Sequence, residues 1–119
     1  MLHTIILSLA SNYQQDYNLS EARRRLEQLI HVWRYTESLW TEPIHSPLPN
    51  LYLNQLLFGA TSLGINQLNE TLKQMETEMG RTPEERRQGI VRIDLDLLQY
   101  DSKRYHLTDW ERPYVKKLL

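Results

Sequence analysis

The sequence RIDLDLL at residues 92–98 decides the fold of this chain. Apolar and acidic residues alternate in it, and neighbouring side chains on a β-strand point to opposite faces. We therefore predict a strand from Ile93 to Tyr100 whose apolar side chains enter a core. Asp94 and Asp96 then share the opposite face, about 7 Å apart.

A helix is predicted before this strand, from Ile65 to Met79, and Gly80 is suited to end it in a left-handed conformation. Its apolar residues recur every three or four positions, as on one face of a helix: Ile65, Leu68, Leu72, Met75 and Met79. The residues between helix and strand, 81–91, are charged and include Pro83 and Gly89, so we expect a mobile loop there.

The amino-terminal part of the chain predicts a similar pair of elements. The segment from His3 to Leu9 is rich in Ile and Leu, which is typical of a buried strand, and a polar loop follows from Ala10 to Asn18. Apolar residues at helical spacing then predict a helix from Leu19 to Ile30. Asn18, with Glu21 three residues later, matches a capping box at its start.

Two more strands are predicted between the helices. The first runs from His31 to Trp40, a proline-rich loop occupies Thr41 to Asn50, and the second runs from Leu51 to Thr61. The tail from Glu111 to Leu119 fits a short strand or a helix. The order β-α-β-β-α-β predicts an α+β, ferredoxin-like sandwich, in which an antiparallel sheet carries two helices on one face. A chain of 119 residues is expected to form a single domain, residues 1–119.

Composition argues against several classes of protein. The 14 basic and 15 acidic residues give a net charge of −1, without the basic excess of a nucleic-acid-binding protein. There is no cysteine, and hence no disulfide and no thiolate metal site. The apolar run at the amino terminus is too short to span a membrane and has no basic leader, so we expect a cytoplasmic location and no membrane partner.

The two aspartates of the last predicted strand suggest a metal site. Mg²⁺ in proteins takes one or two carboxylates together with phosphate oxygens of a substrate, so Asp94 and Asp96 suit two magnesium ions on the phosphates of a nucleotide. The alternative is the ordinary polar face of a half-exposed strand. Neither G-x-x-x-x-G-K-[ST] nor G-x-G-x-x-G occurs, so neither standard phosphate-binding loop is present.

A second group of residues suits a flat heterocycle. Tyr52 and Asn54 are two positions apart on a predicted strand, where the aromatic ring can stack and the amide can bond ring heteroatoms. The alternative is a surface tyrosine and an asparagine near a turn. Cationic residues that could neutralise a transferring phosphoryl group are Arg81, Arg86, Arg87, Arg92, Arg112 and His106. Ordinary solvated charge is the alternative for this set.

Six segments, in order along nearly the whole chain, resemble the 6-hydroxymethyl-7,8-dihydropterin pyrophosphokinase family: residues 9–12, 38–43, 52–54, 75–81, 92–98 and 106–115. The resemblance implies a ferredoxin-like fold and the transfer of pyrophosphate from ATP to a pterin alcohol, a step of folate biosynthesis that releases AMP. It also implies ATP as co-substrate and two magnesium ions.

The resemblance further assigns roles to individual residues. Asp94 and Asp96 would hold the magnesium ions. The pterin pocket would be formed by Thr41, Pro43, Tyr52, Asn54 and Tyr114. The residues around ATP would be Glu76, Arg81, Arg87, His106 and Arg112. The residues acting in catalysis would be Arg92, Arg112, Asp94 and Asp96.

The loop at 81–92 departs most from the family pattern. Pro83 stands where an arginine is expected and Gln88 where a tryptophan is expected, while Arg92 is one residue closer to Asp94. A shift of one residue turns a strand side chain to the opposite face. Another arginine of the loop, Arg86 or Arg87, could therefore act in place of Arg92.

Two hypotheses about function remain open at this point. The first is a minimal active pyrophosphokinase, and the second is a non-catalytic relative that binds pterin or a partner protein. An interaction module with an unrelated ligand is a third reading, because the ferredoxin-like fold hosts many functions. Exposed sheet edges allow either a monomer or a homodimer.

Overall fold

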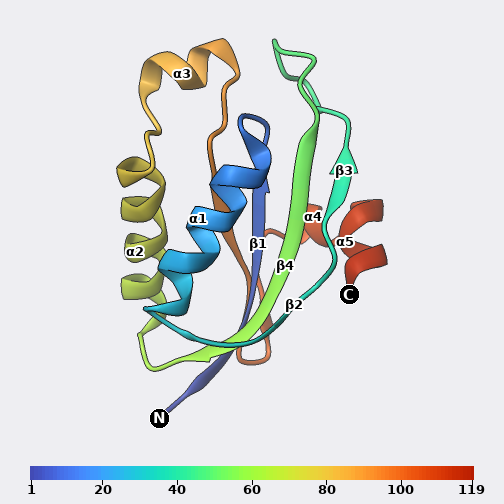
Figure 1. The fold of residues 1–119 in the computed structure, drawn as a ribbon. Coiled ribbons are helices and arrows are strands. Elements are labelled where there is room, and N and C mark those ends of the chain that lie inside the picture. Colours follow the sequence, from blue (N-terminus) through green and yellow to red (C-terminus); the bar gives the residue numbers. More distant parts are fainter.

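The computed structural model describes residues 1–119 of the chain. Its strands are β1 (His3–Ser11), β2 (His31–Tyr35), β3 (Leu39–Thr41), β4 (Tyr52–Thr61), β5 (Asp94–Tyr100) and β6 (Lys103–Arg104). Its helices are α1 (Gln15–Glu27), α2 (Ile65–Glu78), α3 (Pro83–Gln88), α4 (Leu107–Trp110) and α5 (Pro113–Leu118), as Figure 1 shows.

The strands form one antiparallel sheet in the order β2-β4-β1-β5-β6, and β3 pairs with β4 on the same side as β2. Helices α1 and α2 cover one face of this sheet, whereas α4 and α5 lie against the other (Figure 1). The predicted ferredoxin-like α+β fold, with its two long helices on one face, is therefore confirmed. The short helices on the second face are an addition to it.

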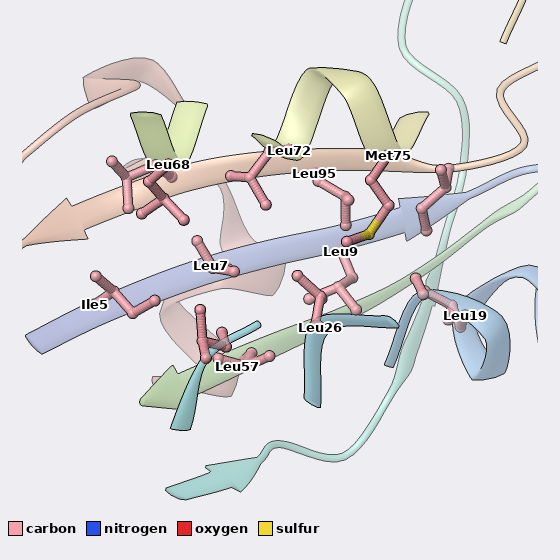
Figure 2. Packing of buried hydrophobic residues seen from close by; sticks show 14 of the residues in the cluster. Ile5, Leu7, Leu9, Leu19, Leu26, Leu57, Leu68, Leu72, Met75 and Leu95 are labelled. Atoms are coloured by element: carbon pink, nitrogen blue, oxygen red, sulfur yellow. The ribbon is translucent and has the colours of Figure 1, made fainter. Parts of the chain in front are cut away.

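The larger core lies between the sheet and helices α1 and α2. Figure 2 shows its main members, which come from three strands and both helices: Ile5, Leu7, Leu9, Leu19, Leu26, Leu57, Leu68, Leu72, Met75 and Leu95. Full burial of one such side chain stabilises the fold by about 1.5–3 kcal/mol relative to exposure. This burial fixes the face of β5 that meets the helices, so Asp94 and Asp96 point the other way, as predicted.

A smaller core on the opposite face holds α4 and α5 against the sheet. Its members are Leu56, Leu98, Trp110, Val115 and Leu118. The register of β5 against β1 shifts between Ile6 and Leu7, which leaves Leu98 without a direct partner and turns it toward this face. The irregularity in β5 thus provides the contact point for the carboxyl-terminal helices.

The predicted strand from His31 to Trp40 is divided into β2 and β3. At the division, the N–H of Thr36 donates to the carbonyl of Leu56 (3.0 Å), and the Thr36 Oγ1 accepts from the N–H of Leu56 (3.0 Å). A side-chain oxygen thus takes the place of a backbone carbonyl in the ladder. Regular pairing with β4 resumes at Leu39.

Helix α1 begins at Gln15, four residues before the predicted start, and the predicted capping box at Asn18 and Glu21 is wrong. Gln14 precedes the helix with a φ of 43° and provides no side-chain cap. Asn18 instead lies inside the helix, where its buried Nδ2 donates to the carbonyl of Tyr13 at 2.6 Å. Asparagine favours the cap position because its side chain bonds nearby backbone groups. In this chain Asn18 uses the same ability to close the turn that precedes the helix.

The segment 81–91 contains helix α3 rather than only a loop. Thr82 caps it, since its Oγ1 accepts from the N–H of Glu85 (3.2 Å), and Pro83 occupies the first turn. Gly89 ends it with a φ of 84°. The tail forms α5, so the helical alternative applies there. None of the helices combines the length and the apolar character needed to cross a bilayer.

Candidate active site

Asp94 and Asp96 lie on one face of the sheet, beside the central strand β1. Their partners across the ladder are Ala10 and Ser8, and Asn54 of β4 pairs with Ala10 from the other side. Because the side chains of Ala10 and Ser8 are small, they leave space above the sheet between the aspartates and β4. The carboxylates remain accessible, with 38% of the Asp94 side chain and 30% of the Asp96 side chain exposed.

The two aspartates interact unfavourably with each other. Burial, followed by the negative charge of Asp94, raises the pKa of Asp96 from 3.8 to about 7. No group of three or more histidine, aspartate or glutamate side chains forms a complete metal cage in the structure. The pair nevertheless fits Mg²⁺, which is commonly bound by one or two carboxylates while water and substrate phosphates complete its coordination. A cation there would also relieve the repulsion.

A cavity of about 540 Å³, which we name the large cavity, lies along the open edge of β5. Strand β6 pairs only with Gln99 and Tyr100, so no strand covers the edge at residues 94–97. Helix α2 lines this cavity on one side. Its cationic lining residues are Lys73, Arg81 and Arg86, and His106 lies beside them with its Nε2 3.8 Å from the Asp96 Oδ1.

Glu76 ties the edge of β5 to helix α2. Its buried carboxylate accepts from the backbone N–H of Leu95 (2.7 Å) and from the Nη1 of Arg81 (2.9 Å). Burial raises the pKa of Glu76 above its usual value. Arg81 also lies 3.7 Å from Asp94, between Nη1 and Oδ1. The pair therefore fixes one guanidinium next to the two aspartates.

A second cavity of about 190 Å³, the small cavity, lies on the sheet face above Ala10. Asn54 forms part of its wall, and its Nδ2 donates to the carbonyl of Leu39 (3.0 Å) and to the Oγ1 of Thr41 (2.8 Å). These bonds fix the plane of the amide. The rings of Tyr52 and Tyr114 also line the cavity, and burial raises the pKa of both phenols, which stay protonated near neutral pH.

The structure gathers most of the residues that the sequence singled out. Around the small cavity it brings together Thr41, Tyr52, Asn54, Asp94, Asp96, Arg112 and Tyr114. Around the large cavity it brings together Glu76, Arg81, His106, Asp94 and Asp96. The two aspartates thus line both cavities, and they are the only residues that do.

Three of the residues singled out line neither cavity: Pro43, Arg87 and Arg92. Arg92 is bound instead by Glu85, through Nε–Oε1 and Nη2–Oε2 contacts of 2.8 Å each, and its guanidinium lies 4.8 Å from the ring centre of Tyr13. Arg87 pairs with Glu84 at the surface of α3. Arg86, proposed above as a substitute, does line the large cavity.

Sequence reasoning missed some residues of the site. Lys73 lies one turn before Glu76 on α2, so helical spacing alone could have placed it in the large cavity. Asp109 and Glu42 line the small cavity; they lie within the matched segments 106–115 and 38–43, but the resemblance assigned neither of them a role. Asp109 is three residues before Arg112, a spacing that predicts contact only once a helical turn is known there.

Comparisons with known proteins agree with this geometry. The model of a family described as 7,8-dihydro-6-hydroxymethylpterin-pyrophosphokinase (HPPK) matches residues 6–119. The chain is 33% identical over 121 residues to a folate synthesis bifunctional protein of Arabidopsis thaliana, covering 93% of this chain and 25% of that protein. It is 31% identical over 121 residues to the mitochondrial folate synthesis bifunctional protein of Pisum sativum, covering 93% and 23%. The chain thus spans about a quarter of the length of these curated relatives.

Proposed function

This chain belongs to the 7,8-dihydro-6-hydroxymethylpterin-pyrophosphokinase family, and from that membership we propose that it transfers pyrophosphate from ATP to 6-hydroxymethyl-7,8-dihydropterin. The products are AMP and the pterin diphosphate, in a step of folate biosynthesis. One observation carries the proposal: Asp94 and Asp96 line two separate cavities at once. A transfer between two substrates needs such a shared, charged boundary.

In this proposal the large cavity takes ATP. Arg81 and Arg86 supply positive charge for the phosphates, and Arg81 is already oriented by Glu76 next to Asp94. Asp94 and Asp96 would hold magnesium, with two ions as in the family expectation. Bound magnesium would neutralise charge on the phosphate oxygens, which is the main requirement of phosphoryl-type transfer.

The small cavity takes the pterin. Its walls combine two aromatic rings, from Tyr52 and Tyr114, with the fixed amide of Asn54. Aromatic faces bind a flat ring by stacking, and a fixed amide selects among ring heteroatoms. The hydroxymethyl group would then face the aspartates, because they form the side of this cavity nearest the large one.

The reaction would be an in-line displacement. The hydroxymethyl oxygen attacks the β-phosphorus of ATP and forms the new O–P bond. The bond between that phosphorus and the oxygen bridging to the α-phosphorus breaks, AMP leaves with this oxygen, and the hydroxyl proton passes to solvent. Positioning and charge stabilisation suffice for this chemistry. Arg112 lines the small cavity and is the arginine placed to meet the transferred group from the pterin side.

Other features of the chain belong to the proposal as well. Residues 1–119 would form one pyrophosphokinase-like domain, as a monomer or a homodimer. Arg92 would act on the phosphates only after leaving Glu85, and Arg87 only after a change in α3. A cytoplasmic location remains a prediction from the sequence alone.

The test is AMP release by the purified chain given ATP, MgCl₂ and 6-hydroxymethyl-7,8-dihydropterin, with an ATP-only control. The proposal requires AMP formation that depends on the pterin and on Mg²⁺, together with one pterin diphosphate per AMP. Pterin binding without any AMP would identify a non-catalytic pterin-binding relative. Absence of both binding and AMP would reject the pterin assignment altogether.

A further inference from the structure

The turn formed by α4 carries three charged residues toward the two cavities. His106 stands directly before the helix and lines the large cavity, whereas Asp109 and Arg112 line the small one. They are spaced three residues apart, so successive turns place them on one side of the chain. The resemblance to the family assigned roles to His106 and Arg112 but none to Asp109.

The position of this turn is fixed by Trp110. The Trp110 side chain is buried in the smaller core, and its Nε1–H lies within hydrogen-bond distance of two carbonyls, those of Leu98 (3.1 Å) and Tyr105 (3.0 Å). The first of these carbonyls belongs to β5, the strand that carries both aspartates. The turn is therefore fixed relative to the strand that carries the two aspartates. Figure 1 shows α4 next to the face of the sheet that lies opposite α1 and α2.

Asp109 contacts a residue of each cavity. Its Oδ1 accepts from the Nε of Arg112 at 2.9 Å, and its Oδ2 lies 4.0 Å from the Nδ1 of His106. Only about a quarter of the Asp109 side chain is exposed (25%). The bond to Arg112 uses Nε alone, so the two terminal nitrogens of the guanidinium remain available for a ligand.

We infer that Asp109 is a positioning residue for the transfer, a role that rests on the proposed function. By holding Nε, it directs the terminal nitrogens of Arg112 to the boundary between the two cavities, where the transferred phosphates pass. A long arginine side chain loses rotamer freedom when it binds an anion, and a preformed bond to Asp109 removes part of that loss beforehand. Asp109 thus acts through Arg112 and does not touch the substrates itself.

A double-mutant cycle tests this inference. Steady-state kinetics would be measured for the wild type, Asp109→Ala, Arg112→Ala and the double variant. We expect Asp109→Ala to lower kcat by about tenfold to a hundredfold, the scale on which misplacement of a catalytic group acts. KM for both substrates should change little. In the Arg112→Ala background the same substitution should have almost no further effect on kcat, because the partner is already absent.

Two further variants separate positioning from folding. Asp109→Asn keeps an oxygen that accepts from Nε, so it should restore much of the lost kcat. Glu111→Ala is the matched control, since it removes an exposed acid that pairs with Lys116 (3.1 Å) on the same segment but outside both cavities. It should leave kcat unchanged. Thermal melting of every variant identifies any loss that comes from unfolding.

The outcomes are distinct for the inference and for the proposed function. An active wild type with Asp109→Ala at full kcat, or with additive losses in the cycle, overturns the role of Asp109 and leaves the proposed function standing. A wild type that forms no pterin-dependent AMP overturns the proposed function, and the inference with it. Non-additive losses with rescue by Asp109→Asn establish both.

Discussion

The two cavities share Asp94 and Asp96 but differ in the charge of their remaining walls. The large cavity adds three cations, Lys73, Arg81 and Arg86, and one buried acid, Glu76, which is paired with Arg81. The small cavity adds the acids Glu42 and Asp109, together with a single cation, Arg112. A polyanion brought in with metal ions suits the first environment, and a neutral ring suits the second. The difference therefore supports the proposed assignment of ATP to the large cavity and of the pterin to the small one.

Removing either of the shared aspartates should abolish the transfer while leaving the small cavity able to bind pterin. Asp94→Ala or Asp96→Ala should lower pterin-dependent AMP formation by about a thousandfold or more, because charge neutralisation at the phosphates is lost. Pterin binding, measured by fluorescence titration without nucleotide, should persist. Glu70→Ala, at an exposed position of α2 outside both cavities, is the control and should remain fully active. Substantial activity in both aspartate variants would refute the metal role.

A change confined to the small cavity should separate the two substrates. Asn54→Ala removes the buried amide that is bound to Leu39 and Thr41. We expect KM for the pterin to rise by about tenfold to a hundredfold, since a site built to hydrogen-bond its ligand discriminates strongly when the bond is lost. KM for ATP should stay within about twofold. A larger effect on ATP than on the pterin would reverse the assignment of the cavities.

The sequence predicted this site unevenly, for physical reasons. The alternation around Asp94 and Asp96 is local and reports directly which face is buried, so the shared face of the two aspartates and the strand that carries them were predicted together. Thr36 divides the strand by a bond to Leu56, 20 residues away, which no local pattern reveals. The turn that carries Asp109 is held against the sheet by the bond from Trp110 to the carbonyl of Leu98, 12 residues away. Interactions distant in sequence account for what was missed.

The raised pKa of Asp96 predicts a smaller effect, on the stability of the fold, that depends on pH. Its pKa in the folded chain, about 7, is above its ordinary value of 3.8, so the contribution of this group to folding is fully present below pH 3.8 and is lost as pH rises from there through about 7. Without Mg²⁺, the melting temperature of the wild type relative to Asp96→Asn should fall by roughly 5 °C between pH 5 and pH 8.

Magnesium should act in the opposite direction over the same interval. The ion binds the deprotonated carboxylate. The increase in melting temperature on adding excess MgCl₂ should therefore be greater at pH 8 than at pH 5. Differential scanning fluorimetry with and without MgCl₂ at both pH values measures the effect of pH and the effect of magnesium on the melting temperature. Equal pH dependence in the wild type and Asp96→Asn would show that burial and the charge of Asp94 do not raise the pKa of Asp96 as described.

The smallest effect concerns Arg92, which lies outside both cavities. Glu85 binds its guanidinium at two points, and the hydrogen bonds from Arg92, together with its positive charge, lower the pKa of Glu85. Glu85→Gln keeps the shape of the side chain but weakens this pair, which is largely solvent-screened, so we expect little loss of stability. If Arg92 serves the large cavity once released, kcat should rise by about two- to fivefold, the scale of a modest population shift. The rise should vanish in an Arg92→Ala background. A lower kcat would mean instead that the pair keeps α3 in a productive position, and an unchanged kcat that Arg92 does not serve the large cavity. Either result would favour Arg86 as the arginine of this segment that meets the phosphates.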